Sequence, residues 1–168
     1  MRRFVLGVFI VAPVACALMT ASSYGQQKSL KEQLVGAWTV VSSSTKLPDG
    51  SAAWGANPIG LTIFTENGRY SSQLMRSDLP KFTSNNRTQG TAEENKAVVQ
   101  GSISSFGTYT VNEAIKTFTI RYEGSTYPNR KGTEETRPFV IEGDELRITN
   151  PAPSTGGGAS QLVYRRAK

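Results

Sequence analysis

Three polar residues in the second half of the chain could recognise a ligand or move a proton: Tyr122, Glu123 and Arg137. A glutamate and an arginine on neighbouring strands can form a buried pair that orients a ligand, although an exposed cross-strand pair worth about 0.5 kcal/mol is the more frequent arrangement. A catalytic use would need a glutamate whose pKa is raised toward neutrality by burial, or a tyrosine held against a charge. Tyr122, Glu123 or Tyr70 would then exchange protons with the substrate of an isomerase or a cyclase.

The residue types that the chain lacks exclude several other mechanisms. It contains no histidine, and its single cysteine is Cys16. Without histidine there can be no Ser-His or Cys-His nucleophile and no His-Glu-x-x-His zinc site. The carboxylates are scattered and do not have the spacing of a calcium-binding loop. We therefore expect neither a metal nor a cofactor.

The N-terminal segment has the composition of a secretory signal peptide. Arg2 and Arg3 precede an apolar stretch from Phe4 to Leu18, and small or polar residues run from Thr20 to Gly25. An apolar stretch of about 15 residues is short for a hydrocarbon core of about 30 Å. We therefore expect a removable signal peptide, residues 1–25, and a protein that is secreted or periplasmic.

The remaining residues, 26–168, are expected to form one mature domain. Their 17 basic and 13 acidic residues give a net charge of +4, compared with +6 for the full chain. Because no basic stripe alternates with stacking aromatic residues, nucleic acid is not an expected partner. Two alternatives for the N-terminal segment stay open: an uncleaved membrane anchor, or lipidation at Cys16, where Pro13 occupies a position at which a leucine-like residue is expected. The membrane is an expected partner only through this segment.

Short runs of alternating polar and apolar residues predict β-structure. The first run covers residues 34–42, with Trp38 and Val40 on one face. A hairpin is predicted from residues 61–65 and 69–75, because the Asn-Gly pair between them supplies the positive φ angles of a tight turn. Five later runs are predicted as strands: residues 106–111, 117–123, 133–141, 146–149 and 161–166.

One helix is expected between the third and fourth strands. Thr91 and Glu94 have the spacing of a capping box, which predicts a helix over residues 92–102. Because this helix has few apolar residues, we expect it to lie over a barrel edge or mouth, with Ala97 and Val98 toward the barrel. The strands and the helix predict an all-β fold: an antiparallel up-and-down barrel of about eight strands with one helical insertion.

Several segments of the chain resemble one family. Gly36-Ala37-Trp38 resembles the Gly-x-Trp motif of lipocalins, and more specific segments are Gly68-Arg69-Tyr70-Ser71, Gln73-Leu74-Met75-Arg76, Pro80-Lys81-Phe82, Thr91-Ala92-Glu93-Glu94, Phe106-Gly107-Thr108-Tyr109-Thr110-Val111 and Gly143-Asp144-Glu145-Leu146. Together they resemble the bacterial and fungal lipocalin-like domain family of short calycin-type barrel proteins. The resemblance implies an up-and-down barrel around a small-molecule cavity. Members often carry histidines before the Glu-Gly-Ser of the central hairpin, where this chain has Arg121-Tyr122, so no role of those histidines is implied here.

Aromatic and apolar residues of the expected strands, together with three polar ones, are the predicted ligand contacts. They are Phe64, Tyr70, Leu74, Phe106, Tyr109, Phe118, Tyr122, Glu123 and Arg137. A barrel of eight strands can hold one small ligand or be filled by its own side chains, and alternation alone does not decide which. Trp54, in the loop after the first strand, either closes the mouth or packs on the outer wall.

Four residues near the two chain ends of the barrel are predicted to be structural. Trp38, next to Gly36, is expected to plug the closed end, because a large aromatic ring buries about 200 Å² there. The resemblance implies that Arg165 or Arg166 lies over this ring, where a guanidinium contributes about 1 kcal/mol. The other arginine is expected to be solvated.

These observations predict a secreted or periplasmic protein that binds a small hydrophobic molecule in the barrel, with one or two polar anchors. The enzymatic alternative is an isomerase or cyclase that uses the same cavity, and a buried, unpaired Glu123 would favour it. The third alternative is a non-catalytic module of the cell envelope or a protein-interaction module. An apolar patch on the outer wall of a barrel without a cavity would favour this third alternative.

Overall fold

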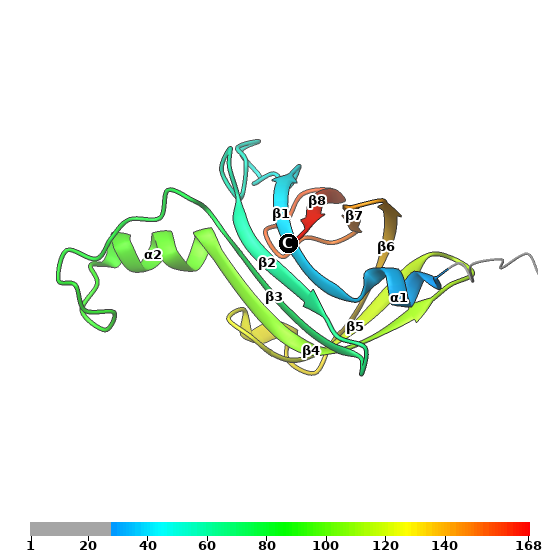
Figure 1. Ribbon diagram of the computed structural model, residues 1–168. Helices are drawn as coiled ribbons and strands as arrows, with labels where there is room; N and C mark the ends of the chain where they lie inside the picture. Colours follow the sequence, from blue (N-terminus) through cyan, green and yellow to red (C-terminus); the bar gives the residue numbers. More distant parts are fainter. Residues whose placement is uncertain (1–27) are drawn as a thin grey trace, which may run out of the picture.

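The strands form a closed antiparallel barrel in which each strand is hydrogen bonded to the next along the chain and the last to the first (Figure 1). The computed structural model describes residues 28–168, so the expected signal peptide and Cys16 lie outside the described residues. The strands are β1 (Gly36–Ser43), β2 (Ile59–Phe64), β3 (Arg69–Met75), β4 (Ser102–Asn112), β5 (Thr117–Ser125), β6 (Glu134–Glu142), β7 (Glu145–Asn150) and β8 (Ser160–Arg166). Within the described residues, the helical segments are α1 (Leu30–Leu34), α2 (Ala92–Gly101) and the 3-10 helix η1 (Pro128–Arg130). The predicted eight-stranded up-and-down barrel is confirmed.

Tight turns set the register of the hairpins. Between β2 and β3, Gly68 has a φ of +80°, and its N–H donates to the Thr65 carbonyl at 3.0 Å. Only glycine adopts this φ readily. The turn places Phe64 opposite Tyr70, which confirms the predicted hairpin, although Gly68 has the positive φ and Asn67 does not.

Alternate residues of each strand point into the barrel. In β5, Phe118, Ile120 and Tyr122 are buried, whereas Arg121 between them is exposed. This is the period-two pattern of a strand with one face on a core and one in water. The half-buried pattern predicted for this strand is confirmed.

Aromatic rings from neighbouring strands fill the barrel near its closed end. The ring of Phe64 lies 5.5, 5.0 and 5.3 Å from the rings of Tyr70, Tyr109 and Phe118, respectively. Phe118 in turn lies 5.5 Å from Phe139. Tilted and edge-on pairs at such distances are favourable beyond the area they bury. This half of the barrel is therefore a packed core.

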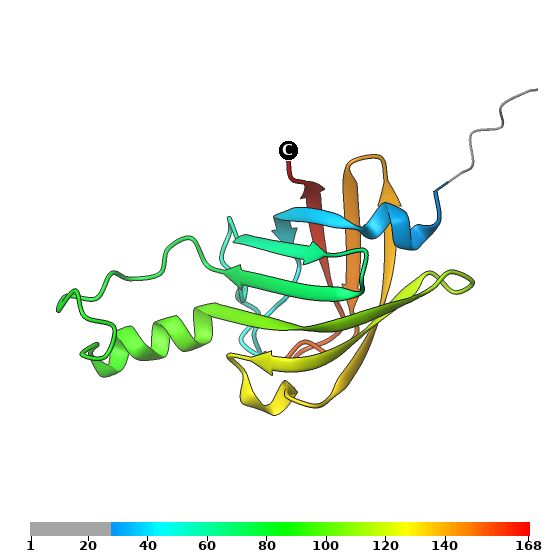
Figure 2. The same ribbon diagram turned by 60° about the horizontal axis from the view of Figure 1, so that its bottom comes forward.

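The helix α1 lies beside the start of β1 (Figure 2). Trp38 of β1 contacts this helix at the closed end of the barrel. It is fully buried, and its indole Nε1 donates to the Leu34 carbonyl at 2.8 Å. The guanidinium of Arg166 lies 4.1 Å from the centre of the indole, whereas Arg165 is exposed. Gly36 has a φ of +132°, and a Cβ there would lie 3.0 Å from the Arg166 guanidinium. Arg166 is thus the arginine over the indole.

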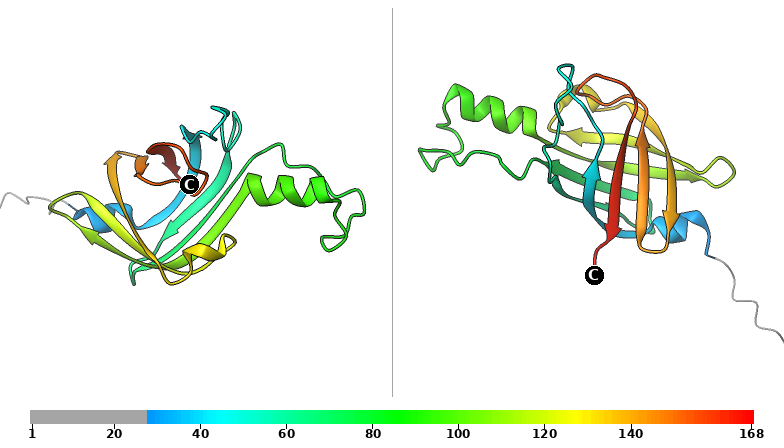
Figure 3. Two further views of the ribbon diagram at one scale, coloured as in Figure 1. Left: turned by 180° about the vertical axis from the view of Figure 1, so that it is seen from behind. Right: turned by 90° about the horizontal axis from the view of Figure 1, so that it is seen from above.

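The helix α2 lies where the sequence predicts it along the chain, but not where it was expected in space. Its capping box is present, because the Thr91 side chain accepts from the Glu94 N–H and Glu94 from the Thr91 N–H. The helix runs directly into β4 without a turn and extends away from the barrel in all views (Figures 1 and 3). Val99 is 77% exposed, so few apolar side chains draw α2 back onto the barrel. Within residues 28–168, no helix has the length and apolar content that crossing a membrane requires.

Candidate functional site at the open end of the barrel

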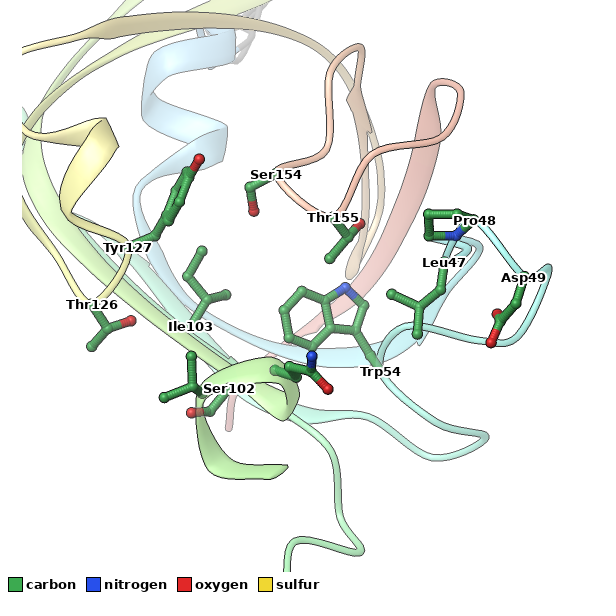
Figure 4. A pocket seen from close by; sticks show the side chains of 12 residues that line it. Leu47, Pro48, Asp49, Trp54, Ser102, Ile103, Thr126, Tyr127, Ser154 and Thr155 are labelled. Carbon is green, nitrogen blue, oxygen red and sulfur yellow. The ribbon is translucent and has the colours of Figure 1, made fainter. Parts of the chain in front are cut away.

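A cavity of about 590 Å³ opens at the end of the barrel opposite Trp38. We call it the mouth cavity. Four segments meet around it: the β1–β2 loop, the junction of α2 and β4, the segment after β5, and the β7–β8 loop (Figure 4). Small-molecule sites in proteins have volumes of about 300–1,000 Å³. The lining residues are Leu47, Pro48, Asp49, Trp54, Val99, Gln100, Ser102, Ile103, Thr126, Tyr127, Ser154 and Thr155.

A second space of about 40 Å³, the inner pocket, lies deeper in the barrel. Trp54, Ile103, Ser154 and Thr155 line both spaces and so form the boundary between them. The indole of Trp54 is buried and extends across the mouth cavity (Figure 4). The Thr155 hydroxyl is buried and has no hydrogen-bond partner among the described residues. Two arginines, Arg130 and Arg137, reach the inner pocket.

These arginines belong to a buried network with Glu135 and Tyr122. Arg137 donates from Nε and Nη2 to the Glu135 carboxylate at 3.1 and 2.9 Å, and the Tyr122 hydroxyl donates to the same carboxylate at 2.6 Å. Arg130 has its Nη2 3.7 Å from Glu135 Oε2, and its guanidinium lies 5.1 Å from the centre of the Tyr122 ring. The side chains of Arg130, Glu135 and Arg137 are 13%, 17% and 8% exposed.

The contacts of this network determine its protonation. Burial raises the pKa of Tyr122 well above its usual value of 10, so the hydroxyl stays neutral. Burial also opposes ionisation of Glu135, but the charge and hydrogen bonds of Arg137 outweigh it and hold the pKa of Glu135 below its usual 4.5. Arginine is always protonated in proteins. Two guanidinium ions therefore face one carboxylate, and the network carries an excess positive charge at neutral pH.

The amino-acid sequence also matches a known family. The match covers residues 35–167 and the family is described as "Lipocalin-like domain". The chain belongs to the lipocalin-like domain family. Among curated proteins, none matches this lipocalin-like domain in sequence. A solved structure, the "REP1-NXSQ fatty acid transporter", is similar to it with a TM-score of 0.37 and 12% identity, over 81% of this chain and 97% of that chain.

The structure separates the predicted ligand contacts of this lipocalin-like domain into groups. Leu74 and Arg137 line the inner pocket, and Tyr122 belongs to the network beside it. Four others are buried but pack against one another in the aromatic core: Phe64, Tyr70, Tyr109 and Phe118. Whether any of them contacts a ligand stays a prediction.

The prediction that Phe106 and Glu123 face the cavity is wrong, because both side chains lie on the outer wall of the barrel. Phe106 is 50% exposed, and Glu123 pairs there with Arg69 through bonds of 2.6 and 2.8 Å. Successive side chains of a strand point to opposite faces. Since Tyr109 and Tyr122 point inward, Phe106, three residues from the first, and Glu123, next to the second, must point outward. The suggested buried Glu123–Arg137 pair was therefore wrong, and Arg137 pairs with Glu135.

Sequence reasoning missed Glu135 and Arg130. A signal for Glu135 was present: Phe139 is an expected core residue of the same strand, and a period of two places Arg137 and Glu135 on its face. Arg130 lies in η1, outside any strand, where no periodicity applies. The sequence allows Trp54 to lie in the mouth or on the outer wall, and in the structure it lies in the mouth.

Proposed function

We propose that this lipocalin-like domain binds a small hydrophobic molecule in the mouth cavity and acts as an exported, secreted or periplasmic, binding protein. The mouth cavity carries the proposal, because its volume is that of a small-molecule site and its wall is largely apolar. Large apolar side chains come from three separate segments: Leu47 and Trp54, Val99 and Ile103, and Tyr127. Val99 and Tyr127 are among the large apolar residues that are exposed to water. A bound molecule would cover them.

The packed core supports a ligand position in the outer part of the barrel. The rings around Phe64 fill the interior, and the inner pocket has only about 40 Å³. A molecule of the size expected from the mouth cavity cannot enter that space as a whole. The apolar body of the ligand therefore stays in the mouth cavity, and only a small group of the ligand can pass Trp54 into the inner pocket.

The geometry gives no support to the isomerase or cyclase alternative. That alternative was favoured by a buried, unpaired Glu123, but Glu123 is on the outer wall and paired with Arg69. The buried carboxylate, Glu135, has its pKa lowered and accepts hydrogen bonds from Arg137 and Tyr122, which is unsuitable for a proton donor at neutral pH. A protein-interaction module would be marked by an apolar outer patch and a barrel without a cavity. The presence of the mouth cavity argues against this alternative.

Partly blocking the mouth cavity is expected to weaken binding without affecting the fold. The neutral apolar fluorophore N-phenyl-1-naphthylamine should bind with a saturable rise in emission. Ser154→Trp adds a large ring to an exposed loop residue that lines the cavity, and should weaken binding by about tenfold or more. A fluorescence titration measures both affinities.

The matched control is Ala159→Trp, which adds the same kind of ring to the same loop away from the cavity. It should leave the affinity for the fluorophore unchanged. Circular dichroism shows whether both variants are folded. Absence of saturable binding, or equal affinities of the two folded variants, would contradict a ligand site in the mouth cavity.

Export is tested separately with the full chain. Expressed in a Gram-negative bacterium, the protein should be recovered from the periplasm or medium with a new N-terminus between Ala21 and Gln26. Mass spectrometry of the purified protein measures this. A chain that still begins at Met1, or that carries a lipid on Cys16, would overturn the removable signal peptide.

A further inference from the structure

The two arginines beside the inner pocket are mostly buried, and some of their N–H groups make no hydrogen bond within the described residues. Among residues 28–168, Arg137 uses Nε and Nη2 for its hydrogen bonds to Glu135 and Tyr122, and its Nη1 group donates none. Arg130 meets Glu135 only at 3.7 Å and donates no side-chain hydrogen bond to the described residues. These free N–H groups are not sealed off by other protein atoms, because among residues 28–168 the fully buried side-chain polar atom without a partner is Thr155 Oγ1. They are therefore open to an acceptor that the chain itself does not supply.

The inner pocket offers no acid to meet this charge. The described residues that line it include Arg130 and Arg137 but no aspartate or glutamate, and the remaining polar groups are neutral, such as Ser72 and Asn150. The Thr155 hydroxyl, buried and without a partner, lies at the boundary with the mouth cavity. Asp49 is the acid of the mouth cavity, and its carboxylate is exposed and accepts from Ser51. The charge of the inner pocket therefore favours an anion.

The size of the inner pocket restricts which anion fits. A site for one water molecule needs about 10–15 Å³ of such space, so about 40 Å³ has room for about three atoms of that size. A carboxylate has three heavy atoms and is planar, and arginine binds it with parallel N–H donors. Phosphate and sulfonate groups are bulkier. The pocket thus matches a carboxylate head and not a whole ligand.

We infer that the ligand is an amphiphile with a carboxylate head, which passes Trp54 to reach Arg130 and Arg137 while its apolar body fills the mouth cavity. This inference rests on the proposed binding at the mouth. It assigns separate roles to the two spaces: the mouth cavity supplies apolar contact, and the inner pocket selects the charge of the head group. Trp54 and Ile103 lie where the head joins the body.

The test compares two ligands that differ only in the head group. Dodecanoate and 1-dodecanol, each below the concentration at which it aggregates, compete with N-phenyl-1-naphthylamine for the full mature protein. Dodecanoate should bind about tenfold more tightly than the alcohol, the effect of hydrogen bonds to a charged group. Arg130→Gln should remove this preference and leave the affinity for the alcohol unchanged, while Arg130→Lys keeps part of it. Lys131→Gln, which removes the same charge from an exposed neighbour outside the pocket, should keep the preference.

Each outcome has one meaning. Equal affinity for acid and alcohol in the wild-type protein would overturn the carboxylate inference and leave the mouth site standing. If neither competes and the fluorophore itself does not bind, the proposed function fails as well. Equal weakening of both ligands by Arg130→Gln would show that Arg130 only supports the fold and would also overturn the inference. If Arg130→Gln does not fold, the ratio of the two wild-type affinities decides alone.

Discussion

Replacing Glu135 with glutamine is expected to lower the free energy of unfolding by about 3 kcal/mol. The carboxylate lies between Arg137 and Arg130 in the barrel interior and accepts from the Tyr122 hydroxyl at 2.6 Å. Glutamine keeps the size of the side chain but leaves two buried guanidinium ions without a counter-charge. Such an uncompensated charge is far more costly than the loss of one hydrogen bond. Urea denaturation of both proteins measures the difference.

Glu123→Gln is the control, because it removes a carboxylate with equally good geometry on the outer wall. Arg69 donates to Glu123 from both Nη1 and Nη2, yet both side chains are more than 40% exposed. Water replaces such a contact almost completely. We expect this variant to unfold at nearly the wild-type urea concentration. Equal losses in the two variants would show that burial of the Glu135 network contributes nothing.

Acid titration tests the same network by a second route. The pKa of Glu135 is lower in the folded protein than its usual 4.5, so the carboxylate contributes stability above that pH. This contribution should disappear as the pH falls through the lowered pKa of the folded state. In Glu135→Gln there is no carboxylate to protonate, and the wild type and the variant should approach each other in stability below about pH 4. A stability difference that is constant over this range would contradict the ionised Glu135.

The barrel could be predicted because its determinants are local. Alternation in residues 117–123, the turn at Gly68 and the capping box at Thr91 each depend on a few neighbouring residues. The direction of α2 could not be predicted in this way. The capping box determines where that helix begins, but its orientation follows from the absence of a turn before β4 and from the shortage of apolar side chains to bury. The orientation of α2 therefore depends on how the helix is joined to the barrel and packed against it, and not on a local motif.

The site was predictable only where it lies on strands. In β6, Phe139 is an expected core residue, so alternation predicts that Arg137 and Glu135 also point inward. In β4 and β5, strict alternation would have excluded Phe106 and Glu123 from the predicted ligand contacts. The mouth cavity is different, because its wall is made largely by three loops without periodicity. Loops that are far apart in sequence come together only when the barrel closes. Trp54 could therefore be named, but not placed, from the sequence.

Trp38→Ala is expected to have the largest effect on stability, a loss of about 3–5 kcal/mol. The indole is fully buried at the closed end, donates to the Leu34 carbonyl and is covered by the Arg166 guanidinium. Alanine would leave a large cavity where α1 and both chain ends of the barrel meet. Denaturation should be followed by circular dichroism, because the substitution removes one of the two tryptophans.

Arg166→Gln and Arg165→Gln separate the stacked arginine from its exposed neighbour. Arg166 also donates to the carbonyls of Val35 and Gln33 at 3.1 and 2.7 Å, so its loss should cost about 1 kcal/mol or more, whereas Arg165→Gln should be neutral. Because Trp38 lies at the end opposite the mouth cavity, Trp38→Phe should lower stability without changing the affinity for N-phenyl-1-naphthylamine. Loss of affinity in a folded Trp38→Phe protein would show that the ligand reaches the closed end. The aromatic core around Phe64 would then have to open to admit it, which the packing of these rings argues against.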